Sequence, residues 1–244
     1  MLNPLPMHFL DQERAFLGGS ETWQAPATKW GKVKHRFRLA YSALRGPDHL
    51  RVMSSREHRM NFAHLLDQVI AFGVPGDVVE IGSYNGQTAL FFQSILQDVG
   101  SGKLLHLYDD FRTLRIDPDP LATLKMRFAR NQRPLPVIHQ GDIFATLPGQ
   151  LPERIAFAHI DCGSGLPDEQ HRDLILHALR SVYPRLAPNA IVVLMDYHDP
   201  GHTLLGADSN PGVKMACDVF LADKPEHMST VYGGYYSQGF FRKQ

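Results

Sequence analysis

The chain has few cysteines and no long apolar segment. Its two cysteines, Cys162 and Cys217, are far apart and form no C-x-x-C pair, which excludes a disulfide framework and argues against a structural zinc site. The longest purely apolar run, Ala190 to Met195, is far shorter than the roughly 18 to 20 residues that a membrane span requires. Met1 to Phe9 lack the basic and apolar regions of a secretory signal. We therefore expect a cytoplasmic protein with no membrane partner.

A net charge is also absent. The 25 lysines and arginines balance 25 aspartates and glutamates, so the chain as a whole has no electrostatic attraction to nucleic acid. Residues 29–51 are a local exception, in which basic and aromatic side chains alternate. We interpret this segment as a solvated helix face or a subunit contact, and keep a nucleic-acid contact as a less favoured alternative. Its members are Lys29, Trp30, Lys32, Lys34, Arg36, Phe37, Arg38, Tyr41, Arg45 and Arg51.

The length of 244 residues suits one large α/β domain with an extension. Residues 1–52 show no clean hydrophobic period, and we expect them to form an N-terminal helical cap or lid. Residues 53–244 are expected to form the main domain. It opens with an amphipathic helix over Arg56 to Phe72, because its apolar residues recur three and four positions apart and Gly73 ends the pattern.

From Asp77 onward, short β-rich runs alternate with helical runs. This alternation predicts right-handed βαβ units and therefore an α/β fold with a doubly wound, Rossmann-like sheet. The last two of seven strands are expected to form a hairpin-like pair that places an antiparallel strand at the sheet edge. The predicted strands are 78–81, 104–108, 137–140, 155–160, 190–195, 229–232 and 238–242, and the predicted helices after the first are 86–98, 121–131, 168–183 and 213–222.

The turn after the first of these strands runs from Glu80 to Gly86. In open α/β sheets, ligands bind beyond the carboxyl ends of the strands, and the first strand-to-helix turn meets the cofactor. Gly82 and Gly86 allow the tight bend and the close helix packing that such a turn needs, and Ser83 and Tyr84 lie between them. The turn lacks G-x-G-x-x-G, which argues against a dinucleotide. The Glu80 carboxylate would suit the cationic amino-acid end of S-adenosylmethionine and repel a pyrophosphate.

Further acidic residues follow the next two strands. Asp109 and Asp110 end the second strand, where a carboxylate binds ribose hydroxyls in nucleotide-binding folds. Asp142 follows the third strand, where it could accept a hydrogen bond from the adenine amino group. Each acidic residue alone is typical of a helix cap or loop, but three at successive strand ends favour an adenosyl ligand.

These motifs resemble the macrocin O-methyltransferase family of class I S-adenosylmethionine-dependent methyltransferases. The resemblance covers residues 54–220. It rests on the segment from Gly76 to Gly86, which is similar to the family's GDxxExGxxxG, and on four further stretches of the sequence. These are Tyr108-Asp109-Asp110-Phe111, Thr146-Leu147-Pro148, Ile160-Asp161-Cys162-Gly163 and the stretch from Val182 to Asn189.

The resemblance implies magnesium-dependent methyl transfer to a hydroxyl of a small molecule or natural product, by a homo-oligomer. The family's ligands would be matched by Asp161, which is also expected to contact the cofactor, and by Asp196. Two positions depart from the family pattern, because Met195 and Gly163 stand where it has aspartates. Our hypothesis is that Asp161 and Asp196 bind the ion and act in catalysis, with Asp199 as a substitute ligand.

Two alternatives remain open at the sequence level. His198 could act as the general base without any metal, since histidine titrates in the useful range. Alternatively, the chain could keep the cofactor fold as a small-molecule-binding protein without catalysis, which the departures at Met195 and Gly163 motivate. The sequence names neither the acceptor nor its reacting atom, oxygen or nitrogen.

Overall fold

The structure, a computed structural model, describes residues 54–112, 117–163, 165–200, 208, 210–233 and 236–244. The expected cap over residues 1–52 and the basic segment 29–51 lie outside the described residues. The first described helix, α3 (Arg56–Ala71), begins at a capping box. In it, the Ser55 hydroxyl accepts a hydrogen bond from the His58 backbone N–H, and the Ser55 backbone N–H donates to the His58 ring.

A seven-stranded sheet forms the centre of the fold, in the order β3-β2-β1-β4-β5-β7-β6. The pairs formed among β1 to β5 are all parallel, as the alternating pattern predicts. The strands are β1 (Asp77–Ile81), β2 (Leu105–Asp109), β3 (Val137–Gln140), β4 (Ile155–Ile160), β5 (Leu186–Met195), β6 (Ser229–Val231) and β7 (Gln238–Arg242).

The last two strands form the predicted antiparallel pair at one side of the sheet. Strand β7 pairs antiparallel with both β5 and β6, so it lies inside the sheet and β6 is the edge strand. β7 thereby satisfies the backbone groups of the buried strand β5, and only the three residues of β6 form the edge.

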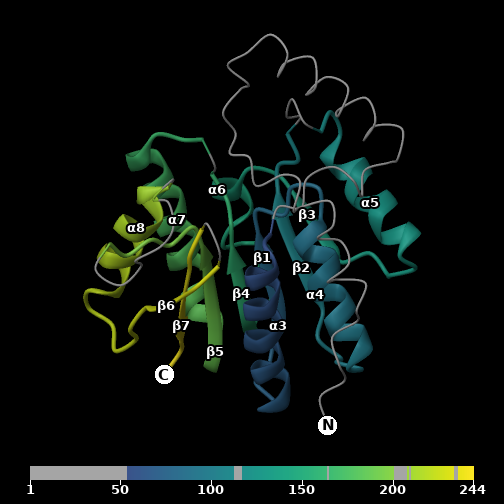
Figure 1. The fold of residues 1–244 in the computed structure, drawn as a ribbon, viewed down its shortest axis with the longest axis horizontal. Coiled ribbons are helices and arrows are strands. Elements are labelled where there is room, and N and C mark those ends of the chain that lie inside the picture. Colours follow the sequence, from purple (N-terminus) through teal and green to yellow (C-terminus); the bar gives the residue numbers. More distant parts are fainter. Residues whose placement is uncertain (1–53, 113–116, 164, 201–207, 209, 234–235) are drawn as a thin grey trace.

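Helices cover both faces of the sheet, as a doubly wound fold requires. In Figure 1, α3, α4 (Gln87–Asp98) and α5 (Pro120–Arg130) lie on one side of the sheet. On the other side lie α6 (Ile143–Thr146), α7 (Asp168–Val182) and α8 (Pro211–Leu221). The short helix α6 was not predicted. A 3-10 turn over Tyr183–Arg185 joins α7 to β5.

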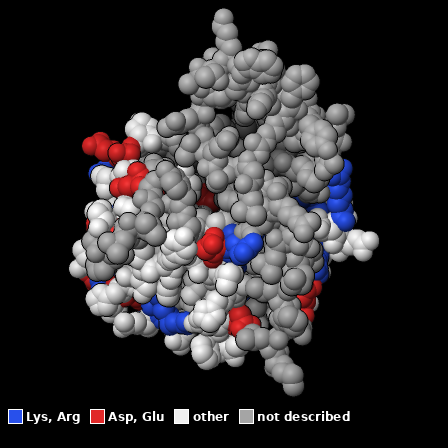
Figure 2. Space-filling model, viewed as in Figure 1, with Lys and Arg blue, Asp and Glu red and all other residues white. Residues whose placement is uncertain are grey.

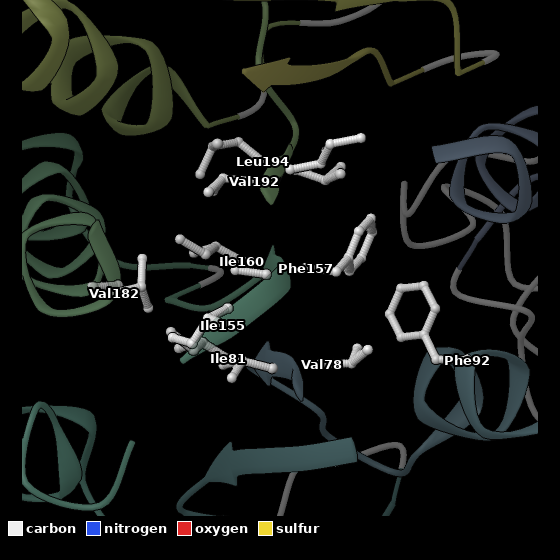
Figure 3. Close-up of a cluster of buried hydrophobic side chains, with 14 of the residues drawn as sticks. Val78, Ile81, Phe92, Ile155, Phe157, Ile160, Val182, Val192 and Leu194 are labelled. Atoms are coloured by element: carbon white, nitrogen blue, oxygen red, sulfur yellow. The ribbon is translucent and has the colours of Figure 1, made fainter. Parts of the chain in front are cut away.

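The apolar core fills both layers between sheet and helices. Figure 3 shows Val78, Phe92 and Phe157 on one side of the sheet and Ile81, Ile155, Ile160 and Val182 on the other. Ile155 and Phe157 are two positions apart yet face opposite sides, because the register of β4 shifts between them. This shift places His159 on the same side as Phe157, under α3 and α4, where its ring contacts Phe62 and Phe92.

Charged side chains of both signs occur on the described surface. On the face in Figure 2, the described acidic and basic side chains are interspersed, and neither sign forms a continuous field. No helix in the described part of the chain is long and apolar enough to cross a membrane. Cys162 and Cys217 are both buried free thiols.

Candidate cofactor and acceptor site

The turn after β1 is held against the end of β4. Gly82 has φ +89°, and a methyl group on it would overlap the backbone carbonyl of Asp161. The two strand ends therefore touch through backbone alone. Gly86 begins α4, and a methyl group there would lie 2.5 Å from Cγ of Leu124. Tyr84 between them has φ +45°, which is strained for a bulky residue. Backbone strain of this kind is common at functional sites.

Asp109 braces this turn from the neighbouring strand β2. One carboxylate oxygen accepts hydrogen bonds of 2.8 Å from the backbone N–H groups of both Ser83 and Tyr84. The other accepts from Phe111 N–H at 2.6 Å. Burial raises the pKa of Asp109 above its ordinary range, although these N–H donors act to lower it. Its neighbour Asp110 is partly exposed and pairs with Arg112 at 2.6 Å. A ribose contact from either residue stays a prediction.

Glu80 lies inside the protein rather than at its surface. Its side chain is 1% exposed, and Oε1 lies 3.2 Å from Nδ1 of His159, which is equally buried. The second Glu80 oxygen and Nε2 of His159 have no hydrogen-bond partner among the described residues. Sequence reasoning missed His159, although a histidine in the otherwise apolar strand Ile155–Ile160 was a signal. The expected contact between Glu80 and a cofactor amine is not tested by this geometry.

A second acidic residue, just before α5, supports the turn. Asp117 is 2% exposed and accepts hydrogen bonds from the Asn85 amide at 3.3 Å and from the Thr123 hydroxyl at 3.1 Å. Asn85, itself buried, belongs to the turn, so the turn is tied to α5 as well as to β2. No sequence pattern indicated this contact, since Asp117 and Asn85 are 32 positions apart.

Asp142, the residue expected near adenine, caps the helix α6. Its carboxylate accepts a hydrogen bond of 2.8 Å from the Phe144 backbone N–H. Phe144 is 54% exposed, and its ring centroid lies 4.6 Å from that of His177 on α7. The cap is the ordinary role of such an aspartate, and the adenine contact stays a prediction.

Asp161 and Asp196 follow the adjacent strands β4 and β5 and influence each other electrostatically. Burial and the negative charge of Asp196 raise the pKa of Asp161 to about 7. Asp161 is nevertheless exposed to solvent. Burial likewise raises the pKa of Asp196, against a 2.5 Å hydrogen bond from the Asn210 amide that lowers it. Asn210, at the start of α8, was not anticipated.

The expected set of three metal ligands is not assembled. Within the described part of the chain, no three His, Cys, Asp or Glu side chains are grouped to hold an ion, so Asp199 does not join Asp161 and Asp196. The buried Tyr197 side chain, and a 2.6 Å hydrogen bond from Ser237 to its carbonyl, fix the chain between Asp196 and Asp199. His198 is half-buried in the same stretch.

The two departures from the family pattern have local explanations. The Met195 thioether accepts a hydrogen bond from the buried amide of Gln238 at 3.1 Å, so this position faces β7. At Gly163, with φ +83°, a methyl group would lie 2.8 Å from both His171 and Leu174. An aspartate at position 163 would therefore collide with α7.

Comparison with known proteins agrees with this geometry. Residues 79–197 match a methyltransferase domain, and residues 21–134 match the macrocin-O-methyltransferase (TylF) family. A mycinamicin III 3''-O-methyltransferase from Micromonospora griseorubida is 29% identical over 57% of this chain and 62% of its own length. This chain is similar to the macrocin O-methyltransferases over residues 21–134. A 4'-O-methyltransferase of a rhamnosyl-tetracenomycin from Streptomyces olivaceus is 28% identical over 56% of this chain. That match spans 59% of the relative, so the chain matches less than two thirds of either curated relative.

Solved structures show the same class I methyltransferase fold. The O-methyltransferase NovP superimposes with a TM-score of 0.62 at 16% identity, over 85% of this chain and 95% of its own. A Podospora anserina methyltransferase with bound S-adenosylhomocysteine gives 0.56 at 16% identity, over 100% and 99%. At these identities, the likeness to macrocin-type and other methyltransferase structures establishes the fold alone.

Proposed function

We propose that this chain transfers a methyl group from S-adenosylmethionine to a hydroxyl group of a small-molecule natural product. The observation that carries the proposal is the presence of two features at the carboxyl ends of the parallel strands. A backbone turn braced by Asp109 touches the end of β4 through Gly82, and two mutually repelling carboxylates, Asp161 and Asp196, follow β4 and β5. The relationship to macrocin O-methyltransferases supports the reaction class.

The cofactor would lie over the turn and the ends of β2 and β3. Gly82, Ser83, Tyr84 and Gly86 would present backbone to it, while Asp110 and Asp109 would offer carboxylate oxygen to the ribose. Asp142 would face the adenine ring, and Glu80 and Asp161 would attract the cationic methionine end. S-adenosylmethionine supplies a methyl group on a positively charged sulfur. When the methyl group is transferred, the sulfur keeps the electron pair of the C–S bond.

The acceptor hydroxyl must lose its proton when its oxygen bonds to the methyl carbon. Asp161 and Asp196 are placed to receive that proton, because their mutual repulsion disfavours having both charged at once. Protonation of one carboxylate would relieve this repulsion as the new C–O bond forms. His198 is the second candidate for this role, since it follows β5, as Asp196 does.

The same two carboxylates would be the ligands of a magnesium ion. Mg²⁺ accepts one or two protein carboxylates and keeps several waters, so the missing third ligand does not prevent binding. A bound cation would be held by Asp161 and Asp196 and would lower the pKa of the acceptor hydroxyl. The thioether of Met195 would contribute nothing, since a hard cation prefers oxygen ligands.

The acceptor class we propose is a deoxysugar, free as a nucleotide sugar or attached to a natural product. A structural neighbour of this fold is a TDP-rhamnose 3'-O-methyltransferase, and a curated relative methylates a rhamnosyl group. A sugar ring offers adjacent hydroxyls and no charge of its own, which suits a site that supplies the carboxylates itself.

The test combines cofactor binding with methyl transfer. Isothermal titration of the full chain with S-adenosylhomocysteine, against NAD as control, should show binding of the former alone. Radiolabelled S-adenosylmethionine should then label TDP-rhamnose or a rhamnoside, with faster transfer in Mg²⁺ than in EDTA. Binding of NAD alone would refute the cofactor assignment. Binding of the cofactor without transfer to any hydroxyl in the panel would favour a non-catalytic binding protein, and labelling of RNA or DNA would favour nucleic-acid methylation.

A further inference from the structure

We infer that His171 is a positioning residue that supports Asp161 and Asp196 from beneath and fixes their relative places. The inference rests on the proposed function, in which both carboxylates face the cofactor and acceptor. His171 lies on α7, ten positions beyond Asp161, and its side chain is 3% exposed. It is therefore too buried to contact a substrate, and any influence must pass through its neighbours.

The first neighbour is the segment that carries Asp161. Nε2 of His171 lies 2.8 Å from the backbone carbonyl oxygen of Cys162, the residue after Asp161. Because a carbonyl only accepts, Nε2 must carry the hydrogen and donate it. Asp161 is held on its other side as well, since its N–H donates to the Ile81 carbonyl at 2.9 Å and its own carbonyl rests on Gly82. The Asp161 backbone is thus clamped between the cofactor turn and His171.

The absence of a side chain at Gly163 makes this clamp possible. A methyl group there would lie 2.8 Å from Cδ2 of His171, so the imidazole occupies the space that a side chain at 163 would need. Position 163 is one of the two where this chain departs from the family's aspartates. An aspartate at position 163 and the imidazole of His171 would therefore need the same space.

The second neighbour is the segment that holds Asp196. A methyl group on Gly212 would lie 2.7 Å from the Asp168 carbonyl oxygen, 2.8 Å from the Arg172 nitrogen and 2.9 Å from Cβ of His171, so the start of α8 packs on the turn of α7 that carries His171. Two positions earlier, Asn210 donates its amide hydrogen bond to Asp196. His171 also acts electrostatically on Asp196, in the direction that lowers the pKa of that carboxyl. His171 therefore holds the Asp161 segment by a hydrogen bond, and its turn of α7 supports the segment that holds Asp196.

The test compares three variants of the full chain. His171→Leu replaces the imidazole with an apolar side chain of similar size and so removes the hydrogen-bond donor, whereas His171→Gln keeps an N–H donor. His64→Gln, at an exposed histidine of α3, is the matched control. We expect His171→Leu to weaken S-adenosylhomocysteine binding at least fivefold by isothermal titration. His171→Gln and His64→Gln should stay within about twofold of the unmodified chain.

Two further measurements separate positioning from a general loss of stability. In an Asp161→Asn background, His171→Leu should cost less than twofold, because the carboxylate it positions is already gone. In the cofactor-free protein, amide hydrogen exchange at residues 161–163 should accelerate about tenfold in His171→Leu and return to normal in His171→Gln. This exchange readout remains valid even if the chain binds no S-adenosylhomocysteine, a result that would refute the proposed function alone. Unchanged exchange at 161–163 in His171→Leu, or an undiminished binding cost in the double variant, would overturn the inference.

Discussion

The carboxyl ends of the parallel strands form two halves that differ in how their carboxylates are stabilised. At the β1–β2 half, Asp109 accepts three backbone N–H groups, and Asp117 accepts from Asn85 and Thr123. At the β4–β5 half, the like charge of Asp196 acts on Asp161, and the Asn210 amide donates a hydrogen bond to Asp196. Asp109 and Asp117 therefore already have hydrogen-bond donors, whereas Asp161 and Asp196 repel each other.

This difference fits two different tasks. A turn that must present backbone to a cofactor benefits from being rigid before the ligand arrives, since ordering it later would cost binding energy. A pair of carboxylates that must take up a proton or a cation has to be destabilised without one. Substitutions in the two halves should therefore have different consequences, and four predictions test this.

The largest effect is expected at Gly82, where the two halves touch. Gly82→Ala would force a methyl group into the Asp161 carbonyl and strain a backbone with φ +89°. We expect a loss of about 2–5 kcal/mol in unfolding free energy, measured by urea denaturation, and of detectable S-adenosylhomocysteine binding. Gly102→Ala has open space around it and should lose neither. Normal binding by Gly82→Ala would show that the halves are independent.

The next effect concerns His58, which ties α3 to the loop before β7. Its Nε2 lies 2.7 Å from the Tyr236 carbonyl, and burial lowers its pKa to about 4 from an ordinary 6.5. The unfolded chain therefore takes up more protons between pH 6.5 and 4, so stability should fall as the pH falls through this window, by about 2–3 kcal/mol. His58→Gln should remove this dependence, while the exposed His64→Gln should keep it. A fall equally steep in His58→Gln would assign it to other groups.

Asp109→Asn tests the rigid half. The amide keeps an acceptor but loses the charge that strengthens the hydrogen bonds from Ser83 and Tyr84. We expect about tenfold weaker S-adenosylhomocysteine binding and a stability loss of about 1–2 kcal/mol. Asp98→Asn, on the protein surface beside Arg133, is the control and should leave binding unchanged. An unchanged affinity in Asp109→Asn would mean that the turn needs no brace.

The smallest effect on stability, with the opposite sign, is expected at Asp161. Its folded pKa of about 7 lies above the ordinary 3.8, so the folded state binds more protons and stability should fall as the pH rises from 4 to 7. Because the side chain keeps exposed surface, we expect only about 1 kcal/mol. Asp161→Asn should be more stable than the unmodified chain at pH 8 yet lose methyl transfer. Asp173→Asn should show neither change, and a less stable Asp161→Asn would contradict the contrast between the halves.

Sequence patterns predicted most of the fold and the general place of the site. Hydrophobic periodicity located five of the six α-helices described from Arg56 onward, and all seven strands to within a few residues. It missed α6, which is too short to show a period, and it did not specify which of the last two strands is outermost. The order of β6 and β7 depends on which strand satisfies the backbone of β5, and no local pattern records that.

Some features of the candidate site were likewise predictable from the sequence, and others were not. The sequence alone determined that acidic residues follow β1 to β5 at one edge, because strand ends can be read from local composition and parallel strands align their carboxyl ends. Only the tertiary structure decided that Asp109 is used by the turn, that Glu80 pairs with His159, and that Asp199 stays apart from Asp161 and Asp196. It also brought His171 beneath both carboxylates. These partners lie far apart along the chain or depend on its course in space, so their contacts follow from packing and have no counterpart in residue spacing.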